Sequence, residues 1–150
     1  HMVTALTFVF IIGFLCYILL PCNPPRYLIP HLYSHPPKLY GLFLYDTLQG
    51  AWDGMSVISG GAFPSLHVAI SSIALLYGFR LRHLSRLFCI LHFVTAPLVV
   101  GVWVATIYLR HHWVIDIVAG LVVAIVAMLL SQYALRWGMR KRLALPLSDS

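Results

Sequence analysis

Residues 117–130 read IVAGLVVAIVAMLL, a run that contains no ionisable side chain. The run lies inside a longer apolar segment, residues 113–137, which is long enough to cross a bilayer as a helix, since this takes about 20 residues. Three other segments are similar in length or nearly so: residues 3–20, 64–79 and 87–108. The last two long segments are separated only by residues 109–112, which predicts a tight helical hairpin. We therefore predict an all-α, integral-membrane bundle of four transmembrane helices.

The composition supports a membrane protein. Of the 150 residues, 61% are hydrophobic and only 9% are charged, which leaves too little polar surface to cover a water-soluble domain of this size. The three cysteines, Cys16, Cys22 and Cys89, show no paired metal-ligand spacing, so we expect neither a disulfide framework nor a cysteine metal site.

The segments predict a simple domain organisation. We expect residues 1–2 to be an expression remnant, residues 3–137 to form the membrane domain, and residues 138–150 to form a basic cytoplasmic tail. Residues 21–63 are rich in proline, glycine and aromatic residues, which favours a loop at the membrane interface. Within this loop, residues 39–48 are predicted to form a short interfacial helix.

The basic residues predict how the bundle is oriented. Seven of the ten lysines and arginines lie in the loop after the second segment or at the end of the fourth, and an alternating path places both on one face. Retained basic residues mark the cytoplasmic face, so the charge is explained by topology and by anionic lipids, and we expect no nucleic-acid partner. These residues are Arg80, Arg82, Arg86, Arg136, Arg140, Lys141 and Arg142.

Three polar clusters fall on the opposite, non-cytoplasmic rim. They are residues 23–27 (NPPRY), residues 60–67 (GGAFPSLH) and residues 110–116 (RHHWVID). Because ionisable groups at membrane depth are costly, each is a candidate for function. A channel or transporter would place polar residues along a whole helix face, whereas here they are confined to one rim.

The second cluster has the features of an anion site. The glycines at positions 60 and 61 allow close approach of a ligand, and Pro64 suits the first position of a helix whose first turn holds residues 65–67. The free N–H groups of a helix N-terminus can hold a phosphate, and His67 would lie beside it. The alternative is a simple helix cap with an interfacial histidine.

The third cluster pairs His112 with Asp116. Residues four apart share a helix face, so the carboxylate can orient the imidazole and leave its other nitrogen as a nucleophile or base. His111 is the weaker candidate because it points elsewhere around the helix. The alternatives are a His–Asp pair that joins helices, or one zinc ion held by His67, His112 and Asp116. The chain has only four acidic side chains, which are too few ligands to favour a two-metal centre.

Both clusters resemble signatures of the type 2 phosphatidic acid phosphatase (PAP2) superfamily of membrane phosphoesterases. Pro64-Ser65-Leu66-His67 is similar to its Pro-Ser-Gly-His signature, and His112-Trp-Val-Ile-Asp116 is similar to its His-x3-Asp signature. The resemblance spans residues 21–120. Family members usually have six membrane helices, which implies that the four here correspond to the last four.

The chain departs from the family pattern at two phosphate-binding cations. Leu19 occupies the lysine position of the first signature, where Arg26 is retained but followed by Tyr27, and Ala105-Thr106 replaces the Ser-Arg pair of the third. Arg110 is the expected replacement. The segments GAFPSLH and HHWVID are more similar to the inositol phosphorylceramide synthase branch, which transfers head groups.

The resemblance implies a lipid phosphate phosphatase that works through a phosphohistidine. His112 would attack phosphorus, Asp116 would orient its ring, and His67 would protonate the leaving oxygen. No metal or organic cofactor is expected. The alternatives are a head-group transferase, a channel and a noncatalytic lipid-binding protein. The resemblance and the polar clusters assign phosphate binding to Arg26, Gly61, Ser65, Leu66 and Arg110.

Overall fold

The computed structural model describes residues 1–29 and 61–144, without the side chains of residues 26 and 141–144. The described part is helical apart from its connections and one isolated bridge between Cys22 and Gly61, which confirms the all-α prediction. The predicted interfacial helix at residues 39–48 lies outside the described residues. The helices are α1 (Met2–Leu19), α2 (Pro25–Leu28), α4 (Leu66–Leu81), α5 (Arg86–Tyr108) and α6 (Val114–Ala144).

The helix boundaries agree with the apolar segments to within one residue at five ends and differ at three, which are both ends of α4 and the end of α6. Helix α4 begins at Leu66 because the side chain of Ser65 caps it, accepting a hydrogen bond from the Val68 N–H, so Pro64 precedes the helix and does not occupy its first position. Helix α6 continues to Ala144, beyond the predicted end at residue 137. Basic side chains are favourable near a helix C-terminus, which accounts for this extension into the predicted tail.

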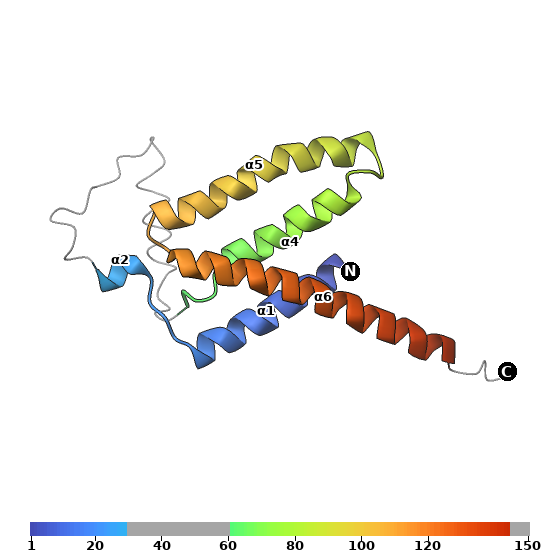
Figure 1. Ribbon diagram of the computed structural model, residues 1–150, viewed down its shortest axis with the longest axis horizontal. Coiled ribbons are helices and arrows are strands. Elements are labelled where there is room, and N and C mark those ends of the chain that lie inside the picture. Colours follow the sequence, from blue (N-terminus) through green and yellow to red (C-terminus); the bar gives the residue numbers. More distant parts are fainter. Residues whose placement is uncertain (30–60, 145–150) are drawn as a thin grey trace.

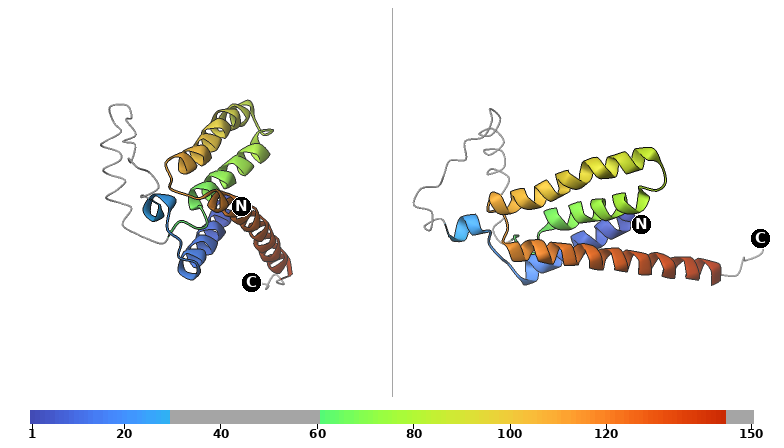
Figure 2. Two further views of the ribbon diagram at one scale, coloured as in Figure 1. Left: turned by 60° about the vertical axis from the view of Figure 1, so that its left-hand side comes forward. Right: turned by 45° about the horizontal axis from the view of Figure 1, so that its top comes forward.

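Helix α4 is the centre of the bundle. It packs against α1, α5 and α6, while α1 also packs against α6. Figure 1 shows α5 and α4 as an antiparallel pair lying along one side of α6, and Figure 2 shows α1 on the other side of α4 from α5. The N-terminal ends of α4 and α6 therefore lie at the same end of the bundle, which is where the polar clusters fall.

Small side chains let the helices approach closely. The fully buried core includes Ala5 of α1, Ala69 of α4, and Ala124 and Ala127 of α6. Small residues at such contacts allow van der Waals packing of one backbone against another, which is how helices associate in a membrane. This close packing holds the ends of α4 and α6 in a fixed relation.

Three helices, α1, α5 and α6, are long and apolar enough to cross a membrane, and α4 is a shorter apolar helix of 16 residues. Many large apolar side chains on these helices are exposed, among them Phe14, Leu98 and Leu129. Exposed apolar surface of this kind is expected where lipid surrounds the protein. The chain is an integral-membrane helical bundle.

Candidate active site

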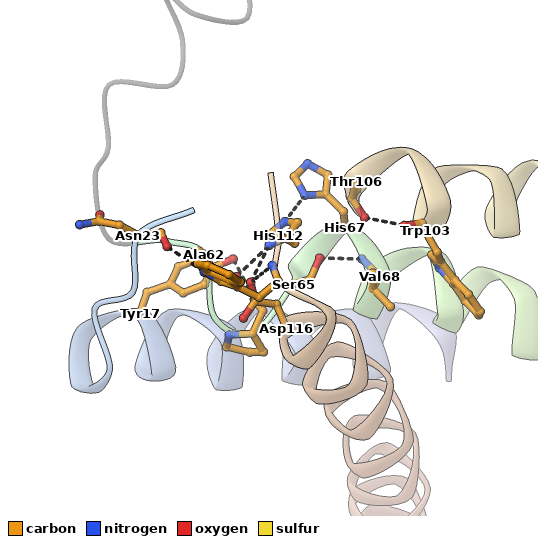
Figure 3. A network of polar contacts seen from close by, with 12 residues as sticks. Tyr17, Asn23, Ala62, Ser65, His67, Val68, Trp103, Thr106, His112 and Asp116 are labelled. Carbon is orange, nitrogen blue, oxygen red and sulfur yellow. Dashed lines mark hydrogen bonds and ion pairs between the residues drawn. The ribbon is translucent and has the colours of Figure 1, made fainter. Parts of the chain in front are cut away.

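The three polar clusters meet at one end of the bundle, as the sequence predicts. The Ala62 N–H donates to the carbonyl of Cys22 (3.1 Å), the residue just before the first cluster, which joins that segment to the second cluster. The Ser65 N–H donates to the Asp116 carbonyl (3.0 Å), which joins the second to the third. The Trp113 indole N–H donates to the Asn23 carbonyl (3.3 Å), which joins the third cluster to the first. Figure 3 shows Asn23, Ala62, Ser65 and Asp116 gathered around His112 at this end of the bundle.

The two predicted catalytic histidines lie side by side. Nδ1 of His67 is 3.4 Å from Nε2 of His112, although 45 residues separate them in sequence. Their rings meet edge to face with centroids 5.6 Å apart. His67 is exposed, whereas only 6% of His112 is exposed. One ring of the pair is therefore exposed and the other is enclosed.

The orientation of His112 is set at its Nδ1 atom. The nearest acceptor is the carbonyl oxygen of Ala62, at 2.9 Å, and Oδ2 of Asp116 is 3.5 Å away. Both groups are acceptors, so Nδ1 carries the proton and donates it toward them. In the neutral ring this leaves the lone pair on Nε2, the atom that faces His67.

Asp116 is almost fully buried, with 1% of its surface exposed. Its Oδ2 accepts a hydrogen bond of 2.7 Å from the backbone N–H of Trp113, the residue just before α6 begins. This contact resembles half of a capping box, in which the third helical residue reaches back to the cap. Asp116 therefore fixes the start of α6 as well as facing His112, and its closest contact is with the backbone.

Burial governs the protonation of His112. Removal from solvent lowers the pKa of His112 below its ordinary value, and the Asp116 carboxylate and the Ala62 carbonyl oppose this effect without reversing it. The ring is therefore neutral at neutral pH. A neutral imidazole with its proton on Nδ1 presents a nucleophilic lone pair at Nε2.

Ser65, one of the predicted phosphate-binding residues, is fully buried. Its Oγ accepts from the Val68 N–H at 3.4 Å, so the described contacts give this side chain a helix-capping role. Since Oγ is the acceptor in that bond, the hydroxyl proton is the group through which Ser65 would reach an anion.

The structure gives the backbone positions of the other predicted phosphate-binding residues. Gly61 forms the bridge with Cys22, and Leu66 is the first residue of α4, with its side chain against Gly13 of α1. Arg110 lies in the turn between α5 and α6 with a left-handed backbone (φ 58°). Arg26 lies in α2.

The sequence also matches a known protein family. A model of the PAP2 superfamily matches residues 1–130. The chain belongs to the PAP2 superfamily. The resemblance that the two His-containing motifs indicated is thereby confirmed.

Several curated relatives of this PAP2 chain are named as inositol phosphorylceramide synthases or a related synthase. It is 32% identical over 142 residues to the phosphoinositol dihydroceramide synthase of Bacteroides thetaiotaomicron, covering 87% of this chain and 45% of the relative. It is also 32% identical over 132 residues to the inositol phosphorylceramide synthase catalytic subunit of Schizosaccharomyces pombe, covering 80% of this chain and 29% of the relative. The chain thus spans less than half the length of these relatives. No solved structure matches it significantly.

The structure of this PAP2 domain adds supporting residues that sequence reasoning missed. The Tyr17 hydroxyl donates to the Pro64 carbonyl (3.2 Å), and the Trp103 indole donates to Ser71 Oγ (2.9 Å), which itself donates to the His67 carbonyl (2.7 Å). The Thr106 carbonyl accepts from the N–H groups of His111 and His112. Most of these bonds end on backbone carbonyls, which carry no residue-specific signal in a sequence.

The geometry also bears on a single-metal site. His112 presents Nε2 to His67 but Nδ1 to Asp116. His67 and Asp116 therefore face different atoms of the His112 ring, and the three side chains do not converge on one point. Within residues 1–29 and 61–144, no three histidine, cysteine or acidic side chains form a group that could hold a metal ion.

Proposed function

We propose that this PAP2 domain cleaves the phosphate ester of a membrane lipid through a phosphohistidine formed on His112. The observation that carries the proposal is the pairing of Nε2 of His112 with Nδ1 of His67 at 3.4 Å, with the opposite nitrogen of His112 held by the Ala62 carbonyl. This arrangement places a nucleophile, His112, next to an acid, His67.

The first half of the reaction forms the covalent intermediate. Nε2 of His112 attacks phosphorus and the ester P–O bond breaks, while His67 in its protonated form delivers a proton to the leaving oxygen. The phosphorylated imidazole becomes positively charged, and the carboxylate of Asp116, 3.5 Å from Nδ1, stabilises that charge.

The second half releases the phosphoryl group. Neutral His67 takes a proton from the acceptor, the acceptor oxygen attacks phosphorus, and the P–N bond to His112 breaks. We propose that Arg26, Arg110, the Ser65 hydroxyl proton and the backbone N–H groups near Gly61 and Leu66 bind the phosphate oxygens, since charge neutralisation is the main demand of phosphoryl transfer. No step requires a metal or an organic cofactor.

The basic side chains support an orientation with this site on the non-cytoplasmic face. Arg80 lies at the end of α4 and Arg136 toward the end of α6, whereas His67 and His112 lie at or before the starts of these helices. By the positive-inside rule, we propose a cytoplasmic C-terminal end of α6 and a non-cytoplasmic active site.

Trapping the intermediate tests the proposal. Purified protein in neutral detergent, mixed briefly with a lipid carrying ³²P in its phosphate, should retain acid-labile and base-stable label on the chain. His112→Ala should lose both the label and turnover. His83→Ala is the matched control because His83 is exposed in the turn between α4 and α5, at the far end of the bundle. Retained labelling of His112→Ala would exclude the assignment.

A second candidate function is head-group transfer, which the names of the synthase relatives favour. The chemistry up to the phosphohistidine is shared, and only the acceptor differs, with a ceramide hydroxyl in place of water. A phosphate-labelled inositol phospholipid, supplied with and without ceramide, separates the two. Labelled inositol phosphorylceramide would establish transfer, and release of water-soluble phosphate or phosphoinositol alone would establish hydrolysis.

A further inference from the structure

A second polar group of residues lies at the opposite end of the bundle from His67 and His112. The side chains come from the last turns of α4 and the corresponding part of α6, and line a cavity of about 500 Å³. Asp116 and Arg136 are 20 residues apart on α6, about 30 Å at the rise of a helix, so the cavity is remote from the catalytic end. Its polar lining residues from these helices are Tyr77, Arg80, Gln132 and Arg136.

The hydroxyl of Tyr77 is the most informative group in this cavity. Tyr77 is 8% exposed, and its oxygen is buried without any hydrogen-bond partner in the described structure. A buried hydroxyl without a partner is costly, and a bound acceptor would remove that cost. Tyr77 is a lining residue of the cavity, so a ligand bound there with hydrogen-bond acceptors is one means of satisfying this O–H donor.

Two guanidinium groups give the cavity its charge. Arg80 and Arg136 both line it, and the only carboxylate in the described residues, Asp116, is at the other end of α6. With its amide oxygen and nitrogen exchanged, Gln132 accepts from both terminal nitrogens of Arg80 at 3.2 Å, which holds that guanidinium in place. The fixed donors and the positive charge match an anion with several oxygen acceptors.

Helix-end electrostatics do not account for both arginines. Arg80 is in the last turn of α4, where a cation is favourable without any ligand. Arg136 is different, because α6 continues to Ala144 and Arg136 is more than two turns from that end. The end of its own helix therefore does not account for the position of Arg136 beside the cavity.

We propose that this cavity binds the phosphate group of an anionic ligand, with Arg80, Arg136 and Tyr77 as donors. A phospholipid is the source that fits the surroundings, because Leu81 and Met139 add apolar lining and the site lies at the end of an apolar bundle where lipid head groups are found. His1 and Met2 also border the cavity, but the proposal rests on the four side chains from α4 and α6.

Lipid retention measures the site directly. The full chain in neutral detergent is titrated with phosphatidylglycerol or phosphatidylcholine, and bound lipid is counted by native mass spectrometry. We expect Arg80→Gln combined with Arg136→Gln to lower phosphatidylglycerol retention by about tenfold, and Tyr77→Phe by about threefold. Binding of phosphatidylcholine should change less, since it carries no net charge.

A second double variant provides the matched control. Arg82→Gln with Arg86→Gln removes the same charge near the same end of the bundle, but neither residue lines the cavity. Both doubles keep the same catalytic end, so lipid bound there contributes equally. Equal losses in the two doubles, or unchanged retention in Tyr77→Phe, would overturn the proposal.

Inorganic phosphate distinguishes the source of the anion. If millimolar phosphate displaces phosphatidylglycerol from the unsubstituted chain but not from the Arg80/Arg136 double variant, the site accepts a free phosphate. If phosphate displaces no phosphatidylglycerol, while the Arg80/Arg136 double variant still retains less of it than the unsubstituted chain, the ligand is the lipid. Either result supports a phosphate-binding cavity that is independent of the proposed catalysis, because a chain that fails to form phosphohistidine can still show it.

Discussion

Nδ1 of His112 lies closer to the carbonyl oxygen of Ala62 (2.9 Å) than to the carboxylate of Asp116 (3.5 Å). The proton on Nδ1 thus has two acceptors, one of which belongs to the backbone and is insensitive to substitution at residue 116. Asp116 in turn makes its shortest contact with the Trp113 N–H. The tautomer of His112 and its charge stabilisation are therefore controlled by different groups, and the two contributions can be separated.

Replacement of Asp116 by asparagine should weaken the reaction without abolishing it. The Ala62 carbonyl still holds Nδ1–H, so the nucleophilic lone pair stays on Nε2, but the charge of the phosphorylated ring is no longer balanced. We expect kcat to fall by about 10- to 100-fold, the usual effect of losing an outer partner of a functional histidine. Steady-state hydrolysis of a lipid phosphate in detergent measures this. A loss as large as that of His112→Ala would contradict it.

The pH dependence of activity follows from the burial of His112. Attack requires the neutral ring, and the pKa of His112 is lowered by burial. Activity should therefore persist below the ordinary pKa of histidine, about 6.5, and decline only when the pH falls through the lowered pKa. The acidic limb of kcat/KM against pH measures this pKa.

The Asp116→Asn variant tests the direction of the pKa shift of His112. The carboxylate opposes the effect of burial by favouring the charged ring. Its removal should therefore lower the pKa of His112 further, and the acidic limb should move to still lower pH. A limb that moves to higher pH in Asp116→Asn would show that a group other than His112 controls it.

The candidate site could be predicted from the sequence because its residues are side chains with a fixed spacing. His112 and Asp116 are four residues apart across the start of α6, and the topology of four apolar segments places His67 at the same end. The distance of 3.4 Å between the histidines and the role of Ala62 depend on loop packing and on a backbone carbonyl, which no residue type specifies. The capping role of Ser65 corresponds to the alternative that the sequence left open for this motif.

Gly120 should be intolerant of any side chain. A Cβ at this position would lie 2.6 Å from the backbone carbonyl oxygen of Ser65 and 3.1 Å from Cβ of Val68. Because backbone cannot move aside as a flexible side chain can, α6 must shift away from the start of α4. We expect Gly120→Ala to destabilise the fold by about 1–3 kcal/mol and to reduce turnover strongly.

Gly101→Ala is the matched control for this substitution. Gly101 is also inside a long helix, and a Cβ there meets nothing within 4 Å. Alanine favours the helix over glycine, so this variant should be as stable as the original chain or more stable by up to ~1 kcal/mol. Thermal unfolding in detergent and the turnover assay compare the two. Equal stability and equal turnover of the two variants would show that the close α4–α6 contact at Gly120 has no special role.

Binding of phosphate should separate the two histidine rings. An oxyanion poised for attack needs a nucleophile within about 3–3.5 Å of phosphorus and an acid within about 2.6–3.2 Å of the leaving oxygen, so the ring nitrogens must be about 6 Å apart or more. The present separation is 3.4 Å. A phosphate in line between them therefore requires one ring to move.

His67 is the ring that should move. It is exposed, whereas His112 is buried and held at Nδ1 by the Ala62 carbonyl. A structure with vanadate bound, a mimic of phosphate in its transition state, should show His67 in a different rotamer and His112 still bonded to Ala62. The reverse, with His112 released from Ala62 and His67 unmoved, would mean that the enclosed ring is not the fixed nucleophile. In that case the roles of the two histidines would have to be exchanged.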